Sequence, residues 1–387
     1  MDFSFSGEQQ AIRSLAREIL QAEATPERVK QAETSAFLDR ALWKQCAEAN
    51  LLGIAIAEEH GGMGMGLLEL CVFFEELGRA VAPGPWFPTL VLGALPIAAF
   101  GTAEQQRNWL PRVAAGEALL SGALDDAGSR ERQSPATRAR KESAAAGDWS
   151  LHGAKRALPC AEDAAALLIP AAPEGEARAA LFLVAAGGAG ISLLPQRIST
   201  GEPRCDLRLD AAPAQRLGGA AGTAGVSGTA GEGGPLAWLE AHALAALCAM
   251  QVGVSESAMR IAAKYTSERE QFGVPIGSFQ AVQQRLADCY VDLEAMRWTL
   301  WRAAARLAAG RPALREARIA KWWAAEAGAR IAGAALHLHG GIGADVDYPI
   351  HRHFLWSKSL ELQLGGAGES EEALGRQLAQ LEPAEEL

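Results

Sequence analysis

The chain has 387 residues, 49% of them hydrophobic, which is enough to form two or three domains with substantial cores. Lysine and arginine total 36 against 46 aspartates and glutamates, and the net charge of −10 argues against a nucleic-acid-binding protein or one that docks on an anionic membrane. The six cysteines stand singly, without metal-ligand or redox spacing, and are expected to be small core residues in a reducing compartment.

The N-terminus predicts neither export nor membrane insertion. Its first residues, Met-Asp-Phe-Ser-Phe, lack both a cationic region and an apolar core. The longest apolar stretch, residues 90–100, is short and contains Pro96. We therefore expect a cytoplasmic protein without a membrane-spanning segment.

Residues 1–116 are predicted to form an α-helical domain. Ser6 and Gln9 have the spacing of a capping box ahead of an amphipathic helix. Further helices are predicted where apolar residues recur every three or four positions: residues 37–52, 67–80 and 103–110. Prolines at positions 83, 85 and 88 predict a loop after the second of these. Such helices need neighbouring domains to cover their apolar faces.

Residues 117–234 have a different sequence pattern, which predicts a β domain. Short runs rich in Leu, Ile and Val are separated by Gly, Pro and Asp, which is the pattern of strands and turns. The candidate strands are residues 119–124, 149–156, 166–171, 180–184, 191–194 and 206–209. The glycine-rich stretch 218–234 predicts a surface loop, after which the sequence becomes helical again.

Residues 235–387 predict a bundle of four or five helices. Two long amphipathic helices are expected on either side of a joint at residues 265–283, which is rich in glycine and proline. Ser278 is expected to cap the second helix by accepting from its free amide hydrogens. A later helix, residues 314–338, is predicted to end at Gly340.

The joint also carries a candidate ligand site. Arg269, Phe272 and Gln280 place a cation, an aromatic ring and an amide around one tight connection. A guanidinium can hold a diphosphate through two parallel hydrogen bonds, and the ring can cover an adenine or a ribose. A nucleotide site is one interpretation of these residues. A solvated arginine beside a core phenylalanine is the other.

Four motifs, in chain order, resemble those of the acyl-CoA dehydrogenase family. They are Glu59-His-Gly-Gly-Met-Gly64, Trp149-Ser-Leu-His-Gly-Ala-Lys155, Arg269-Glu-Gln-Phe272-Gly-Val-Pro-Ile with Gln280, and His337-Leu-His-Gly-Gly-Ile-Gly343. The resemblance implies an α+β fold with an N-terminal α-helical domain, a central β domain and a C-terminal four-helix bundle. It also implies FAD as the cofactor, an acyl-CoA thioester as the substrate and an electron-transferring flavoprotein as the electron acceptor.

The resemblance further assigns the cofactor contacts. It implies that the three joint residues reach the FAD of a neighbouring subunit. The turn with His337, Gly340 and Gly341 would lie on the adenine side of FAD, where glycine allows close approach of the backbone. A metal site is not predicted, because His337 and His339 have no Cys, Asp or Glu at ligand spacing. The assembly would be a homodimer, a homotetramer or a heterotetramer with a second dehydrogenase chain.

The sequence departs from the family pattern mainly at the catalytic base. The family desaturates an acyl-CoA between Cα and Cβ, and a glutamate removes the α-proton. In most members that glutamate lies 15 positions after the proline of a Tyr-Pro pair, which here is Leu364. In a minority it lies about 26 positions before the joint arginine, which here is Ala243. Glu361 and Glu240 each lie one helical turn before these positions, and each is either a relocated base or a solvated glutamate.

The segments expected to face the flavin ring depart as well. Residues 124–131 read Leu-Asp-Asp-Ala-Gly-Ser-Arg-Glu where the family commonly has Thr-Glu-Pro-x-x-Gly-Ser-Asp, and Pro159 stands where a flavin-binding Thr or Ser is usual. The residues that the resemblance places at the adenine and diphosphate of FAD, in contrast, follow the family pattern. An acyl pocket would be lined by apolar residues such as Leu244 and Leu247.

Three interpretations follow from this combination. The favoured one is a subunit that pairs with a catalytic paralogue and completes its FAD site, as in the paired dehydrogenases of steroid and dicarboxylate breakdown that the chain resembles. The second is a self-sufficient dehydrogenase whose base is Glu240, Glu361 or another carboxylate. The third is a flavoenzyme of altered chemistry, such as a sulfinoacyl-CoA desulfinase, which needs no α-proton removal.

Overall fold

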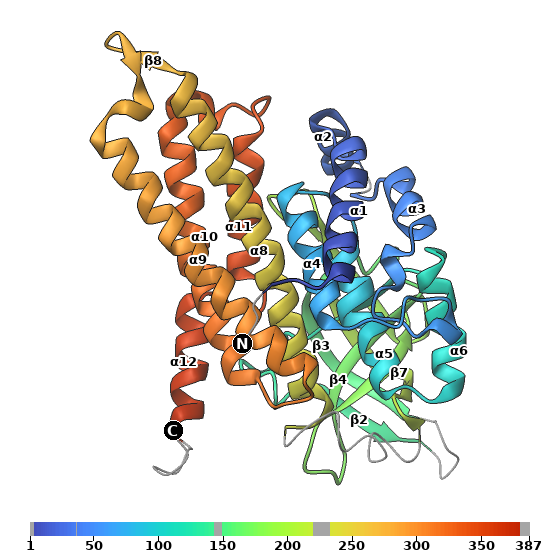
Figure 1. Cartoon of the computed structure of the whole chain (residues 1–387). Helices are drawn as coiled ribbons and strands as arrows, with labels where there is room; N and C mark the ends of the chain where they lie inside the picture. The colour runs from blue at the N-terminus through green and yellow to red at the C-terminus, as the bar shows by residue number, and fades with distance from the viewer. Residues whose placement is uncertain (1–3, 36, 143–148, 220–232, 380–387) are drawn as a thin grey trace.

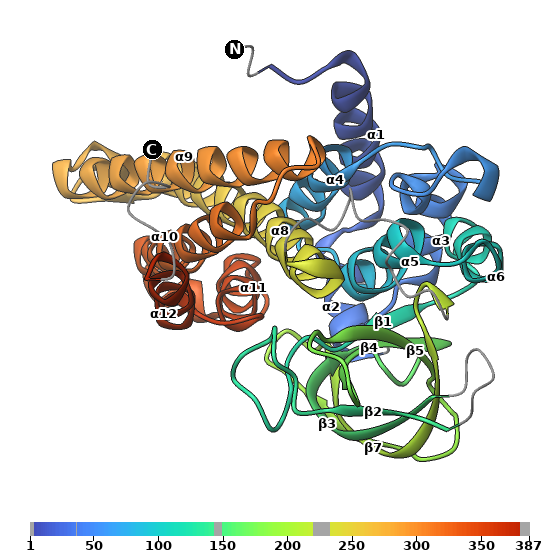
Figure 2. The same ribbon diagram turned by 90° about the horizontal axis from the view of Figure 1, so that it is seen from below.

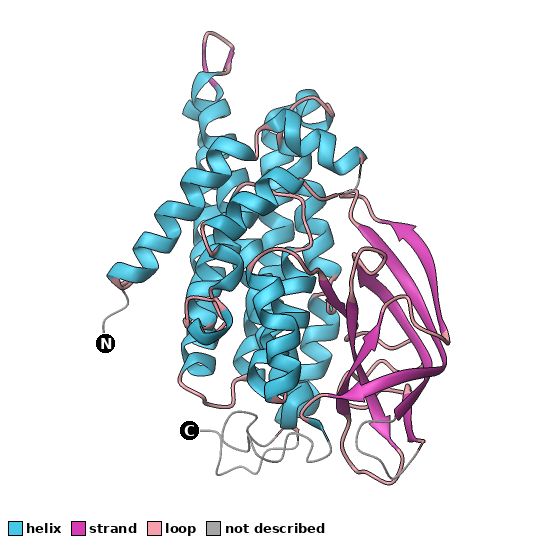
Figure 3. Ribbon diagram, turned by 90° about the vertical axis from the view of Figure 1, so that its right-hand side faces the viewer, coloured by secondary structure: helices cyan, strands magenta, loops and turns pink. Residues whose placement is uncertain are grey.

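The computed structural model describes residues 4–35, 37–142, 149–219 and 233–379. Figure 1 shows N-terminal helices in blue to cyan, a β domain in green and long C-terminal helices in yellow to red. In Figure 3 the helices of both parts form one body, and the strands lie to one side of it. This is the predicted α+β arrangement.

The N-terminal part is helical, as predicted. Its elements are α1 (Gly7–Glu23), α2 (Pro26–Thr34), α3 (Arg40–Glu48), α4 (Leu67–Arg79), the π-helix η3 (Phe87–Ala94), α5 (Leu95–Phe100) and α6 (Ala103–Ala114), with the 3-10 turns η1 (Leu51–Gly53) and η2 (Glu58–His60). The capping box is confirmed, since Ser6 Oγ accepts from the Gln9 amide at 3.2 Å and Gln9 Oε1 accepts from the Ser6 amide at 3.0 Å.

Two local predictions in this part are wrong. The helix expected over residues 37–52 is shorter, because Asp39 caps the start of α3 and Asn50, left-handed with a φ of 57°, follows its end. The loop expected at Pro88 is instead helix, which runs through η3 into α5. Pro88 lies in the first turn of η3, where a missing N–H removes no hydrogen bond, and so it begins the helix.

The β domain is a closed ring of strands. Its elements are β1 (Leu120–Gly122), β2 (Arg138–Lys141), β3 (Trp149–Pro159), β4 (Ala166–Pro173), β5 (Ala180–Ala185), β6 (Ile191–Arg197) and β7 (Pro203–Arg216). β2 pairs with β3 and β4, β5 pairs with β4 and β7, and β3 pairs with β7. Figure 2 shows the rounded outline of this ring. β1 and β6 pair along its sides with β4 and β7.

One strand of the ring was not predicted. β2 reads Arg-Ala-Arg-Lys, and only Ala139 of these is buried, so the segment has no apolar alternation to recognise. Most of the predicted glycine-rich loop, residues 220–232, lies outside the described residues.

The C-terminal part is a bundle of long helices. They are α8 (Gly234–Glu268), α9 (Gln280–Ala308), α10 (Leu314–His339), α11 (Ile350–Leu362) and α12 (Ala367–Leu378). Between α8 and α9 lie the short strands β8 (Glu270–Gln271) and β9 (Val274–Pro275) and the turn η6 (Ile276–Ser278), and η7 (Gly340–Ala344) follows α10. The predicted cap at Ser278 is wrong, because its hydroxyl donates to the Pro275 carbonyl at 2.7 Å and Phe279 holds the cap position.

α8 is the central helix of the fold. By length and hydropathy it could cross a membrane, but 89% of its apolar window is buried inside the structure, as in the core helix of a globular protein. It crosses α4 so closely that a Cβ on Gly253 would lie 1.9 Å from the carbonyl oxygen of Glu75. All six cysteines are unpaired and buried, which confirms them as core residues.

Candidate functional site

The predicted joint forms the tip of the C-terminal bundle. The β8–β9 hairpin stands clear of the rest of the chain at the top of Figure 1. Arg269 follows the last residue of α8, and its carbonyl accepts from the Ile276 amide at 2.8 Å, which ties the two ends of the hairpin together. Phe272 is 94% exposed at a φ of 60° and lies edge-on to Phe279, with 6.2 Å between the ring centroids. A cation and an exposed ring on this turn are placed to contact another molecule.

The turn after α10 lies at the same end of the bundle. Tyr265 of α8 stacks on His339 with 4.4 Å between ring centroids, and Tyr348 lies 5.3 Å from the same ring. His339 is buried and its Nδ1 donates to the Ala335 carbonyl at 2.7 Å, so it supports the turn. Exposed at this end are the remaining predicted cofactor contacts: Gln280, His337, Gly340 and Gly341.

The two expected base positions are apolar and buried. Leu364 is 6% exposed and Ala243 is fully buried. Leu364 has a φ of 55°, which is uncommon for a residue other than glycine, and Gly365 follows at 90°. The turn after α11 therefore keeps a specific shape, but the side chain that it positions cannot accept a proton.

Glu240 is held in a buried cluster. It lies on α8 and is 2% exposed. Its carboxylate accepts from the Gln133 side-chain amide, and the guanidinium of Arg318 on α10 donates to it at 3.2 Å. Arg318 in turn lies 3.4 Å from the side-chain oxygen of Gln377. The carboxylate is therefore already engaged by a guanidinium and an amide, as in a structural ion pair.

Glu361 is also paired. Its carboxylate accepts from Lys358 at 2.6 Å on the same helix. The neighbouring cation, Lys321, is buried and donates to the carbonyl oxygens of Leu360 and Glu361 at 2.7 and 2.9 Å. Burial lowers the pKa of Lys321 to about 8. Lys321 thus fixes the end of α11 just before Leu364, and Glu361 remains at the partly exposed side of that helix.

The β1–β2 loop, residues 123–137, reaches from the β domain to the C-terminal bundle. Arg132 donates to Asp125 Oδ1 at 2.8 Å, and its guanidinium lies 4.0 Å from the carboxylate of Glu369 on α12. Arg132 also lies against the Leu364 turn, because a Cβ on Gly365 would be 3.4 Å from its Nη2. Gln133 of the same loop binds Glu240 on α8. The loop therefore contacts α8, which carries Ala243, and α12, which follows Leu364.

Little interior space is left beside Leu247. A cavity of about 30 Å³ lies there, lined partly by Trp86, Phe87, Met250 and Trp356. Such a volume holds about one or two water molecules. The indole of Trp86 is 1% exposed, and its N–H donates to the Ala82 carbonyl at 3.0 Å, which fixes the ring in place.

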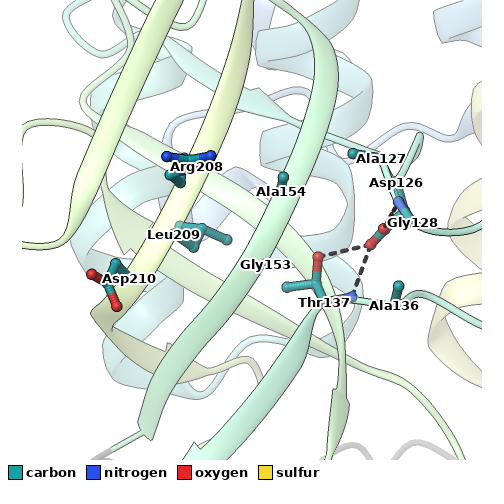
Figure 4. Close-up of a pocket in the computed structure, with 10 residues that line it drawn as sticks. All are labelled: Asp126, Ala127, Gly128, Ala136, Thr137, Gly153, Ala154, Arg208, Leu209 and Asp210. Atoms are coloured by element: carbon teal, nitrogen blue, oxygen red, sulfur yellow. Dashed lines mark hydrogen bonds between the residues drawn. The ribbon is translucent and has the colours of Figure 1, made fainter.

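A wider depression, of about 500 Å³, lies on the β domain (Figure 4). A buried polar group in its lining, Asp126, accepts from the Thr137 hydroxyl at 2.7 Å, the Thr137 amide at 3.0 Å and Lys155 at 2.9 Å. Burial opposes ionisation of Asp126, but the adjacent Lys155 charge and these hydrogen bonds prevail and lower its pKa below the ordinary value. This satisfied pair stabilises the ring of strands.

Comparison with known families decides the fold family. Residues 6–117 match the model for the acyl-CoA dehydrogenase N-terminal domain, and residues 241–378 match the model for the acyl-CoA dehydrogenase C-terminal domain. The chain belongs to the acyl-CoA dehydrogenase family. FAD is the cofactor of this family, and the resemblance drawn from the four motifs is confirmed.

Several members of the acyl-CoA dehydrogenase family are similar over their whole length. Acyl-CoA dehydrogenase FadE27 of Mycobacterium tuberculosis is 35% identical, covering 98% of this chain and 99% of its own. A Tcur3481-Tcur3483 steroid ACAD variant is 43% identical with a TM-score of 0.88, covering 96% of this chain and 98% of the other. The ChsE4-ChsE5 complex of M. tuberculosis contains a chain 35% identical with a TM-score of 0.88, covering 99% of this chain and all of the other, 100%.

The residues of this family member are suited to FAD at the diphosphate end but not at the ring end. The exposed guanidinium of Arg269 forms no hydrogen bond or ion pair within the part of the chain that the structure describes, so it is free to bind a diphosphate. At the ring end, Pro159 has no hydroxyl to offer, and its carbonyl already accepts from Ser121 at 2.5 Å. Arg132 lies beside Gly365, which follows Leu364, and Gln133 binds Glu240, one helical turn before Ala243.

Sequence reasoning identified Glu240 but missed its partners, Gln133 and Arg318. Glu240 and Arg318 lie on different helices, and Gln133 comes from the β domain, so no local spacing connects them. The unusual residues of segment 124–131 were the only signal, since they marked a loop that had departed from the family pattern.

Proposed function

We propose that this chain is a subunit of a heteromeric acyl-CoA dehydrogenase, in which a catalytic paralogue desaturates an acyl-CoA thioester between Cα and Cβ. The observation that carries the proposal is the buried apolar pair at the two base positions, Leu364 and Ala243, each 6% exposed or less. The paralogue would supply the glutamate that removes the α-proton, because this chain has no carboxylate at either position.

The role proposed for this chain is to complete the paralogue's FAD site. Arg269 would hold the diphosphate through two charge-assisted hydrogen bonds, and Phe272 and Gln280 would cover and orient the nucleotide. The exposed turn with His337, Gly340 and Gly341 would approach its adenine. When bound, FAD accepts the hydride from the substrate, and the residues of this chain only bind and orient it.

The similar proteins support a pair of unlike chains. Two of the solved structures that resemble this chain are described by two component names each, Tcur3481-Tcur3483 and ChsE4-ChsE5, and one of them is called a steroid ACAD. We extend this to a heterotetramer as the assembly, with a steroid-type acyl group as the first substrate class to test. An electron-transferring flavoprotein would reoxidise the flavin.

The structure argues against a self-sufficient dehydrogenase that uses Glu240 or Glu361 as its base, because both carboxylates are already paired. A desulfinase needs no such base, so the pairing of these two glutamates does not bear on that interpretation.

Co-expression tests the proposal directly. The chain is produced with affinity tags, alone and together with candidate paralogues that keep a glutamate at the position of Leu364 or Ala243. We expect one paralogue to co-purify in a fixed ratio and the complex to be yellow, whereas the chain alone is colourless. A yellow homo-oligomer from the chain alone, with one flavin per chain, would refute the proposal.

A further inference from the structure

The contacts of the β1–β2 loop form a clasp across the space between the β domain and the C-terminal bundle. Gln133 donates from the loop to Glu240 on α8, which is 2% exposed, and Arg318 on α10 binds the same carboxylate at 3.2 Å. Arg132 also reaches the bundle, where its guanidinium lies 4.0 Å from Glu369 on α12, while its bond to Asp125 at 2.8 Å lies within the loop.

We infer that this clasp is an intramolecular plug, which fills this chain's own flavin-ring site with its own side chains. The inference rests on the proposed function, in which this chain lends residues to another cleft and holds no flavin in its own. Both contacts lie next to the expected base positions: Gln133 binds Glu240, one helical turn before Ala243, and Arg132 Nη2 lies 3.4 Å from a Cβ built on Gly365, which follows Leu364.

The clasp is built to stay closed. The Glu240 carboxylate is 2% exposed and has almost no access to water, so its hydrogen bonds come from Gln133 and Arg318. A ligand that entered this space would have to displace Gln133 and leave the carboxylate with one partner fewer. Arg132 is half of an ion pair with Asp125 within the same loop, which keeps the loop folded back on itself.

Removing the loop's side of the clasp tests the inference. Arg132→Ala/Gln133→Ala deletes both anchors but leaves the Glu240–Arg318 pair in place. A matched control in the same loop is Arg130→Ala/Glu131→Ala, because both of these side chains are exposed. Each full-length chain is purified alone and titrated with FAD, and binding is followed by the quenching of flavin fluorescence. We expect the clasp variant to bind FAD at least tenfold more tightly than the wild type and the control variant.

Equal affinity of the clasp variant, the control and the wild type would overturn the inference while leaving the proposed function intact. A wild-type chain that is yellow when purified alone would overturn both. Circular dichroism confirms that each variant is folded.

A second variant keeps the volume of the clasp but reverses its interaction. Gln133→Glu places a carboxylate against Glu240, and like charges in contact repel. We expect limited trypsin digestion at Arg130 to be at least threefold faster in this variant than in the wild type, because the released loop can adopt the extended conformation that a protease binds. An unchanged cleavage rate would show that the clasp does not hold the loop, and would overturn the inference.

Discussion

Substitution of Arg269 is the most informative change among the residues proposed to complete the paralogue's FAD site. Arg269→Ala in the complex with the paralogue removes the cation but leaves the hairpin's backbone intact, since the Arg269 contact to Ile276 is made by its carbonyl. The guanidinium has no internal partner among the described residues, so the substitution breaks no ion pair in the chain itself. Its effect on FAD binding is therefore free of a compensating change in the unbound protein.

The magnitude follows from the hydrogen bonds lost. A charge-assisted hydrogen bond contributes about 1.5 to 3 kcal/mol, and at an exposed site the lower value applies, so a bidentate pair contributes about 3 kcal/mol. Since about 1.4 kcal/mol corresponds to a factor of ten, the dissociation constant of FAD should rise by about a hundredfold and by at least tenfold. Arg269→Lys keeps the charge but not the paired geometry, and should lie in between.

The assay is flavin retention. The complex is passed over a gel-filtration column, and the ratio of flavin absorbance to protein absorbance is compared with a dissociation constant from fluorescence titration. Arg311→Ala is the control, because Arg311 is exposed and lies just beyond the far end of α9, whose 29 residues span about 43 Å. If the FAD dissociation constants of the Arg269→Ala and control complexes are equal, the proposal that Arg269 binds the paralogue's FAD is refuted.

Two further predictions concern stability. Gly253→Ala should destabilise the chain by about 3 kcal/mol or more, because its Cβ would lie 1.9 Å from the Glu75 carbonyl oxygen. Gly333→Ala should instead stabilise α10 by roughly 0.5 to 1 kcal/mol, because its Cβ would have no atom within 4 Å. Urea denaturation measures the free energy of unfolding of both variants. Burial lowers the pKa of His242 and of His353 to about 4, so the unfolded chain takes up protons first as pH falls from about 6.5, and stability should drop by about 3 kcal/mol per histidine by pH 4. His353→Gln should remove its share of this pH dependence, and an unchanged slope between pH 7 and pH 4.5 would contradict the assignment.

Much of the fold could be predicted because its signals are local. The recurring apolar residues of α8 and α9, the Ser6 capping box and the apolar runs of β3, β4 and β5 are each contained in one stretch of sequence, although α8 is buried on every side from Leu239 to Glu256 and not on one face as predicted. β2 was missed because a strand of four residues with one buried side chain carries no such period. η3 was missed because a proline in the first turn of a helix looks, in sequence, like a proline that ends one.

The candidate site was predictable in its parts but not in its assembly. The joint and the turn after α10 were recognised as motifs, while the stack of Tyr265 on His339 that joins them depends on the path of two helices. Glu240 was identified as a carboxylate near a base position. Its pairing with Gln133 and Arg318 joins three segments distant in sequence, so only the structure shows that this carboxylate is already engaged.

Dye reduction by the isolated chain tests the central claim most directly. The chain purified alone and loaded with excess FAD is assayed with short-chain, long-chain and steroid-type acyl-CoA thioesters, in parallel with the co-purified complex. A positioned general base contributes roughly 10² to 10⁴ in rate, so the chain alone should turn over at least about a hundredfold more slowly than the complex on every substrate. Robust turnover by the chain alone that Glu240→Gln or Glu361→Gln abolishes would contradict the account and establish a dehydrogenase with a relocated base.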